Sequence, residues 1–151
     1  MDQPAPAKPS AGPAVIPSTS AGPFGTLSGR VLVVEDDPLN QHLVRRMLEK
    51  HGLKITVVDT GEAAVEAALN GKWDVVLMDC LLPGMDGFEA TRAIRAGLDG
   101  RHLPIIALTA NAQPEDRDEC IAAGMTDFLP KPVRRADLYI CLKKWLPPTS
   151  A

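Results

Sequence analysis

Short apolar runs alternate with amphipathic stretches along the chain from residue 30 onward. Five of these runs are predicted to be strands; the first is rich in β-branched residues, as buried strands are, and the last is short. They lie at residues 30–34, 54–58, 74–78, 105–108 and 127–129. In the first, third and fourth runs, consecutive positions are apolar, which is typical of strands covered on both faces of a sheet.

A helical pattern follows each of the five runs, and helix-boundary residues mark most of its ends. The predicted helices are 38–51, opened by Pro38 and closed by Gly52; 62–69, capped by Thr60 and closed by Gly71; 88–96, closed by Gly97; 114–123, opened by Pro114 and closed by Gly124; and a last one through 138–145, closed by Pro147 and Pro148. In the last helix, Leu138, Cys141, Leu142 and Trp145 form one apolar stripe. Five strand–helix units with short connections predict right-handed crossovers and a doubly wound α/β fold with a parallel sheet.

Residues 1–28 differ in composition from the rest of the chain. Six prolines are interleaved with Ala, Ser and Gly, and Asp2 and Lys8 are the charged residues. Such a segment buries too little apolar surface to offset its ordering entropy. We therefore expect a flexible linker over 1–28, a folded domain over 29–147 and a short tail over 148–151, and the linker favours a module of a longer protein.

Charge and composition narrow the functional classes. The net charge is −3 and aromatic residues make up 4%, which argues against a nucleic-acid partner. The three cysteines have no metal-binding spacing and are expected to be reduced thiols. No apolar stretch approaches the roughly 20 residues that cross a bilayer, and the N-terminus does not resemble a signal peptide. We expect a cytoplasmic protein without direct membrane contact.

Residues able to handle metal or phosphate follow four of the predicted strands. Glu35 and Asp36 come after the first strand, Asp79 after the third, Thr109 after the fourth and Lys131 after the fifth. The carboxyl ends of parallel strands meet at one edge of a sheet, which is where open α/β sheets bind ligands. Acids, a hydroxyl and an amine at that edge predict a site for a divalent cation and a phosphoryl group.

The three carboxylates repel one another unless a cation neutralises them, and an oxygen-only set of few ligands suits Mg²⁺. Acids after strands also cap helices, and we favour that interpretation for Asp37, which precedes Pro38. For Glu35, Asp36 and Asp79 we favour the metal site. Asp79 is the candidate nucleophile toward phosphorus, with Lys131 and Thr109 stabilising the phosphoryl oxygens.

Other site types are disfavoured. The first strand is not followed by a glycine-rich loop, so neither a dinucleotide fingerprint nor a P-loop is present. Asp79 has no second acid two residues later, where many aspartyl-phosphate phosphatases place a general acid. Cys80 is predicted to be a buried structural thiol. The three histidines, which do not cluster, are predicted to lie on the surface: His42, His51 and His102.

Four segments together resemble the receiver domain of two-component signalling, above all the receivers of hybrid histidine kinases. They are VVEDDPLN (33–40), MDCLLPGMDG (78–87), ALTANA (107–112) and FLPKP (128–132). The resemblance covers residues 30–146. It implies a flavodoxin-like (βα)5 sandwich with a five-stranded parallel sheet in the order 2-1-3-4-5, in agreement with the alternation described above.

The resemblance also implies a chemistry for the acidic residues. Asp79 would accept a phosphoryl group from a histidine of a kinase or a histidine phosphotransfer domain. Asp36, Asp79 and the backbone carbonyl of Leu81 would bind Mg²⁺ or Mn²⁺, and Glu35 would hold a metal-bound water.

For the fourth and fifth strands, the resemblance implies a conformational switch. Thr109 would hydrogen-bond the phosphoryl group, Lys131 would pair with it, and a cis Lys131–Pro132 bond would aim the amine. Phe128 would turn inward as Thr109 moves. This motion would change the face formed by helix four, strand five and helix five, which receivers use for partners.

The sequence departs from the family pattern near the acceptor. Asp37 stands where hybrid-kinase receivers often have Asn. Leu81 occupies a position that is commonly polar, and an apolar side chain there could obstruct the attacking water, so we expect slow loss of phosphate. Asn111 is expected to touch the same water path.

Several alternatives stay open at the sequence level. The chain could be a stand-alone response regulator rather than the C-terminal receiver of a hybrid kinase, although the linker and the motifs favour the latter. A pseudo-receiver that binds partners without phosphate is disfavoured by the complete set of site residues, and a phosphohydrolase by the missing general acid. Exposed apolar residues on the last helix would allow a homodimer.

Overall fold

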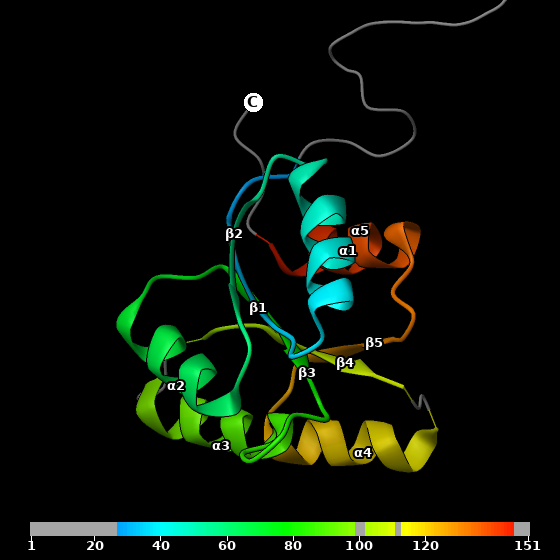
Figure 1. Cartoon of the computed structure of the whole chain (residues 1–151). Coiled ribbons are helices and arrows are strands. Elements are labelled where there is room, and N and C mark those ends of the chain that lie inside the picture. Colours follow the sequence, from blue (N-terminus) through cyan, green and yellow to red (C-terminus); the bar gives the residue numbers. More distant parts are fainter. Residues whose placement is uncertain (1–26, 99–101, 111–112, 147–151) are drawn as a thin grey trace, which may run out of the picture.

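The computed structural model describes residues 27–98, 102–110 and 113–146. Within them, strands and helices alternate along the chain (Figure 1). The elements are β1 (Arg30–Val34), α1 (Pro38–Glu49), β2 (Lys54–Val58), α2 (Gly61–Asn70), β3 (Val75–Asp79), α3 (Gly87–Leu98), β4 (Ile105–Thr109), α4 (Pro114–Ala123), β5 (Asp127–Pro130) and α5 (Arg135–Trp145). No helix in these ranges is long and apolar enough to span a lipid bilayer.

The five strands form one parallel sheet in the order β2-β1-β3-β4-β5. This confirms the predicted doubly wound α/β fold. Successive strands are added on one side of β1 up to β2 and on the other side from β3 onward, so the strand order reverses at the β1–β3 pair. Val34 pairs with Met78 in that register, so the residues that follow β1 emerge beside the end of β3.

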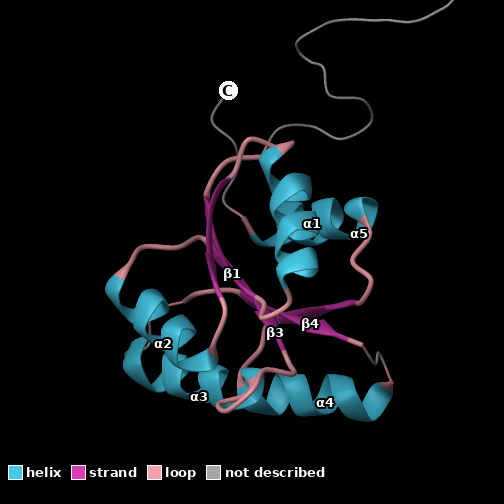
Figure 2. Ribbon diagram, viewed as in Figure 1, coloured by secondary structure: helices cyan, strands magenta, loops and turns pink. Residues whose placement is uncertain are grey.

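Two hydrophobic cores lie on opposite faces of the sheet, as the predicted double coverage requires (Figure 2). Helices α2, α3 and α4 cover one face, and α1 and α5 cover the other. Alternate residues of the central strands supply the two cores: Leu32, Val34, Val76, Met78, Ile105 and Ala107 on the first face, and Val31, Val33, Val75, Leu77, Ile106 and Leu108 on the second.

Side chains cap the starts of three helices. Asp37 accepts a hydrogen bond from the backbone N–H of Leu39 at the start of α1, which confirms its predicted capping role. Thr60 accepts from the N–H of Ala63 at the start of α2, also as predicted. Helix α3 begins with a reciprocal pair that the sequence analysis did not identify, in which Asp86 and Glu89 each accept from the other's backbone N–H.

The predicted end of the third helix at Gly97 is wrong, because α3 continues to Leu98. A Cβ atom at Gly97 would approach Leu69 Cδ1 to 2.6 Å. The glycine therefore serves the close packing of α3 against α2 and does not terminate the helix.

The predicted surface position of His51 is also wrong. Its side chain is 1% exposed, and its ring lies 5.1 Å from that of Tyr139 on α5. The backbone carbonyl of His51 accepts a hydrogen bond from Leu27 N–H at 2.8 Å. Leu27 lies within the predicted linker, and its side chain is buried in the core under α1 and α5. His42 and His102 are exposed, as expected.

At the amino end of the sheet, Arg95 joins α3 to the segments that lead into β4 and β5. Its guanidinium donates to the carbonyl oxygen of Leu103 at 2.6 Å, to that of Gly124 at 2.8 Å and to Thr126 Oγ1 at 3.1 Å. Burial lowers the pKa of Arg95, yet a guanidinium keeps its charge in proteins. Three oxygen acceptors therefore satisfy a partly buried cation at this end.

Candidate active site at the carboxyl edge of the sheet

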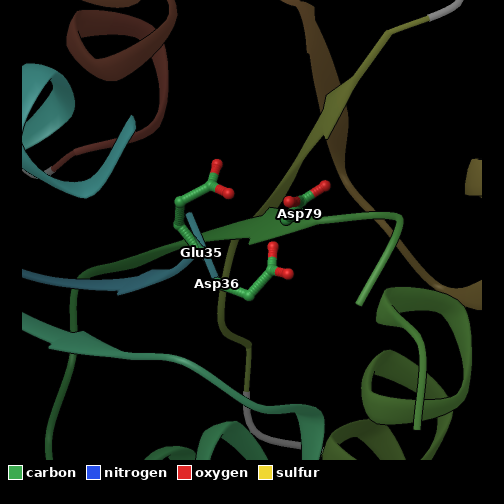
Figure 3. Close-up of side chains that lie close together, drawn as sticks. All are labelled: Glu35, Asp36 and Asp79. Atoms are coloured by element: carbon green, nitrogen blue, oxygen red, sulfur yellow. The ribbon is translucent and has the colours of Figure 1, made fainter. Parts of the chain in front are cut away.

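Three carboxylates gather where β1 and β3 end (Figure 3). Glu35 and Asp36 follow β1, and Asp79 is the last residue of β3. One ligand oxygen of each residue lies within 4.8 Å of the other two. Glu35 and Asp79 are only 1% and 3% exposed, whereas Asp36 is open to solvent. The adjacency of the two strands thus produces a compact acidic cluster with one accessible side.

Lys131 contributes an ammonium group to this cluster. It follows β5, and its backbone N–H donates to the carbonyl of Thr109 at 2.7 Å, which joins the ends of β4 and β5. Its Nζ lies 2.9 Å from Asp79 Oδ2 and 3.2 Å from Glu35 Oε1. The Lys131–Pro132 peptide bond is cis, as the resemblance implies.

Burial and neighbouring charges change the proton affinities at the site. Burial raises the pKa of Glu35; the backbone N–H of Asp37 acts in the opposite direction, and the nearby Asp79 adds to the rise. Burial alone would lower the pKa of Lys131, but the hydrogen bond to Asp79 and the attraction of both carboxylates outweigh it, so this pKa is raised. Lys131 therefore stays charged at neutral pH.

The donor set of this cluster suits a hard divalent cation. When ionised, three carboxylates and one ammonium group leave two negative charges without compensation. All the side-chain ligand atoms are oxygens, the exposed one belongs to Asp36, and Mg²⁺ and Mn²⁺ favour such ligands. The cluster can therefore hold a metal ion on its open side.

The other residues predicted for the site lie on β4, β5 and the loop after β3. Thr109 ends β4 at the same edge, and it is buried. Phe128 lies within β5, half-buried, with its backbone paired to Ala107. The backbone N–H of Leu81 donates to Asp79 Oδ1 at 3.1 Å, while the Leu81 side chain is 72% exposed. Asn111 lies outside the described residues.

Sequence reasoning missed three residues that shape the site. Gln41 Nε2 donates to the backbone carbonyl of Glu35 at 2.6 Å and so fixes the end of β1. A Cβ at Gly61 would collide with the carbonyl oxygen of Met85, and one at Gly87 with that of Asp79. Both glycines begin helices that approach the β3–α3 loop closely. Their presence at helix starts was visible in the sequence, but the backbones they approach were not.

A groove beside the site opens between α1 and the β5–α5 loop. Its volume is about 290 Å³, and Leu43, Val44, Met47 and Val133 line its apolar part. Glu35 and Lys131 also line it. Leu39 and Leu43 on α1 are 64% and 45% exposed, so the apolar surface continues outward from the acidic cluster.

The comparisons with known proteins agree with this geometry. The model of the response regulator receiver domain family matches residues 31–143. The crystal structure of the receiver domain of sensor histidine kinase PA1611 from Pseudomonas aeruginosa PAO1 has a magnesium ion coordinated in its active-site cleft. It is 48% identical to this chain with a TM-score of 0.73, covering 79% of this chain and 98% of that one.

Two further matches show the range of proteins that carry such a domain. The sensor protein GacS of Pseudomonas syringae pv. syringae is 42% identical over 126 residues; the match covers 82% of this chain but 14% of GacS. The receiver domain of the Saccharomyces cerevisiae response regulator Ssk1, solved with the histidine phosphotransfer signaling protein Ypd1, is 30% identical. Its TM-score is 0.73, and the match covers 81% of this chain and 90% of that one.

Proposed function

Because this chain belongs to the response regulator receiver domain family of two-component signalling, we propose that Asp79 accepts a phosphoryl group from a phosphohistidine of a partner protein. The observation that carries the proposal is the position of Asp79. Its Oδ2 lies 2.9 Å from Lys131 Nζ, and its carboxylate belongs to a cluster with Glu35 and Asp36. A carboxylate nucleophile, a cation for the phosphoryl oxygens and a metal-binding group therefore meet at one point.

In the proposed transfer, an oxygen of Asp79 attacks the phosphorus as the bond from phosphorus to the histidine nitrogen breaks. The imidazole leaves with the electron pair of that bond, and the product is an aspartyl phosphate. Lys131 pairs with a phosphoryl oxygen, and the Thr109 hydroxyl donates a hydrogen bond to another. Both groups stabilise charge on the phosphoryl oxygens in the transition state.

The residues that would hold the metal are Asp36, Asp79 and the backbone carbonyl of Leu81, with Glu35 holding a metal-bound water. When bound, Mg²⁺ or Mn²⁺ supplies positive charge against the phosphoryl oxygens. The two uncompensated negative charges of the cluster and the exposed Asp36 support this assignment. The magnesium ion in the related PA1611 receiver domain supports it further.

The proposed output is a change in the face formed by α4, β5 and α5. Thr109 and Phe128 lie on neighbouring strands, and Ala107 pairs with Phe128 across them. Movement of Thr109 toward a phosphoryl group would leave space for the Phe128 ring. The half-buried ring, which packs at the margin of the core beside α4, is positioned for such a motion.

The donor partner we propose is a histidine phosphotransfer domain or the histidine-bearing domain of a kinase, docked through a helix in the groove between α1 and the β5–α5 loop. The groove supports this choice because it leads from the exposed Leu43 to Lys131 and Glu35. An apolar helix seated there would bring its histidine toward Asp79. The Ssk1 receiver domain, solved with Ypd1, is a relative with such a partner.

We further propose that the parent protein is a hybrid sensor histidine kinase, with this receiver at its C-terminal end. The similarity to the receiver domain of sensor kinase PA1611 and to sensor protein GacS supports this context. A stand-alone regulator and a phosphate-independent module are the alternatives.

The proposed function is tested by intact-protein mass after incubation with acetyl phosphate, with and without Mg²⁺. Wild type should gain one phosphoryl group only when Mg²⁺ is present, and Asp79→Asn should gain none. A gain retained by Asp79→Asn would contradict the choice of acceptor. If wild type shows no gain and does not bind beryllofluoride, a phosphoryl mimic, the chain is a phosphate-independent module.

A further inference from the structure

Phe128 lies on the face formed by α4, β5 and α5, where α4 contacts its ring and α5 contacts the side chain of the preceding residue, Asp127. The Arg117 guanidinium of α4 lies over its ring, with Cζ 4.8 Å from the ring centroid. The backbone N–H of Phe128 donates to Asp127 Oδ1 at 2.8 Å, and Asp127 Oδ2 accepts from Trp145 Nε1 of α5 at 2.9 Å. Phe128 is therefore connected directly to α4 and, through Asp127, to α5.

Within the described residues, the Arg117 side chain interacts with the Phe128 ring. On a helix, a residue meets those three and four positions away, and for Arg117 these include Cys120 and Ile121, with no acid among the four. Within the described parts of the chain, Arg117 forms no ion pair although α4 is rich in acids. Its guanidinium instead meets the electron-rich face of an aromatic ring.

We propose that Arg117 is a positioning residue that holds the Phe128 ring in its half-buried place and thereby opposes the phosphorylated state. The inference rests on the proposed function, in which Phe128 turns inward when Asp79 is phosphorylated. Arg117 is exposed on the outer side of α4, so an inward turn takes the ring away from the guanidinium. The contact then exists in the unphosphorylated state but not in the phosphorylated state, so it favours the unphosphorylated state.

A contact present in only one of two states changes the affinity for a ligand of the other. A cation over an aromatic ring at an exposed site is a weak interaction. Its loss should therefore make binding of a phosphoryl mimic about threefold tighter. A contact that only supports the fold would leave the affinity unchanged or weaken it, so the direction of the change distinguishes the two roles.

The test compares the affinity for beryllofluoride, at fixed Mg²⁺, by isothermal calorimetry of the whole chain. Arg117→Gln removes the cation but keeps a good helix former, and Arg117→Lys keeps a cation. Arg92→Gln is the matched control, because Arg92 is an exposed arginine on α3 and its loss changes the net charge equally. Thermal unfolding of each variant without the mimic measures any effect on the fold.

We expect Arg117→Gln to bind the mimic about threefold more tightly than wild type, Arg117→Lys to lie between the two, and Arg92→Gln to match wild type. Equal or weaker binding by Arg117→Gln, or equal tightening by Arg92→Gln, would overturn the positioning role. If wild type itself did not bind beryllofluoride, the proposed function would fail, and the inference with it.

Discussion

At the amino end of the sheet, Arg95 donates to three oxygen acceptors, whereas at the carboxyl end three carboxylates gather and Lys131 pairs with two of them, Glu35 and Asp79. Both ends hold charged groups that are at least partly buried, Arg95 at one end and Glu35 and Asp79 at the other. The acceptors around Arg95 carry no formal charge, and each of its three guanidinium nitrogens donates to one of them. The acidic cluster has more negative charge than its lysine can balance.

The difference shows which end of the fold is built for stability and which for binding. A charged donor that satisfies several buried acceptors is costly to remove. Carboxylates crowded beside one another instead disfavour the metal-free protein, and a bound cation relieves this cost. Variants at the amino end should therefore change the free energy of unfolding most, and variants at the carboxyl end should change the affinity for metal most.

The largest effect is expected at the amino end, from Arg95→Met. The carbonyls of Leu103 and Gly124 would lose a charged donor, and the free energy of unfolding in urea should fall by about 2 kcal/mol. Arg92→Met on the same helix, where the side chain is exposed, is the control and should change stability by less than about 0.5 kcal/mol. Equal stabilities for the two variants would contradict the role of Arg95.

The next effect is expected at the carboxyl end, from Asp36→Asn. Loss of one ligand charge should weaken Mg²⁺ binding by about tenfold or more, while the metal-free protein should be as stable as wild type or more stable, because one repulsive charge is gone. Mg²⁺ titrations by calorimetry and by thermal unfolding measure both quantities. Asp37→Asn keeps a capping residue and should leave Mg²⁺ binding unchanged; an equal loss in both variants would contradict the assignment.

A smaller effect is expected from Leu81→Gln, which replaces the exposed apolar residue two positions after Asp79. We expect the phosphorylated variant to lose its phosphate a few-fold faster than wild type, because the polar side chain no longer obstructs the attacking water. Release of inorganic phosphate after removal of the donor measures the rate. Leu39→Gln, at a leucine of similar exposure on α1, serves as the control. Faster loss from wild type than from Leu81→Gln would refute the obstruction.

The smallest effect is expected from thiol reagents. Burial raises the pKa of Cys80 and of Cys120, and it raises that of Cys141 to about 12. Very little thiolate therefore exists at pH 8, although Cys80 adjoins the acceptor. The folded protein should show almost no labelling by Ellman's reagent, and all three thiols should react in denaturant. Rapid labelling of Cys80 in the folded state would mean that the carboxyl end opens below the acidic cluster.

Much of the carboxyl end could be predicted from the sequence, because the polar residues directly follow apolar strands. Once the strands at 30–34 and 74–78 are identified, parallel pairing brings Glu35, Asp36 and Asp79 together. The cap by Asp37 was predicted for a similar local reason, since it precedes Pro38 at a helix start. Features that depend on residues close together in the sequence can be predicted without a structure.

The amino end could not be predicted in the same way. Arg95 looks like an ordinary helix residue, and its acceptors lie 8, 29 and 31 residues away in the chain. Gly97 was misread as a helix stop because its partner, Leu69, lies on another helix. His51 was placed on the surface because its burial depends on Tyr139, far along the sequence. Contacts between distant segments decide all three.

The most direct test of the central claim is to locate the phosphoryl group on the chain. Protein phosphorylated with acetyl phosphate and Mg²⁺ is reduced with borohydride, which converts an aspartyl phosphate to homoserine, and the peptides are sequenced by mass spectrometry. We predict homoserine at position 79, absent when Mg²⁺ is omitted. Homoserine at any other aspartate, or none in protein whose intact mass shows a phosphoryl group, would contradict it.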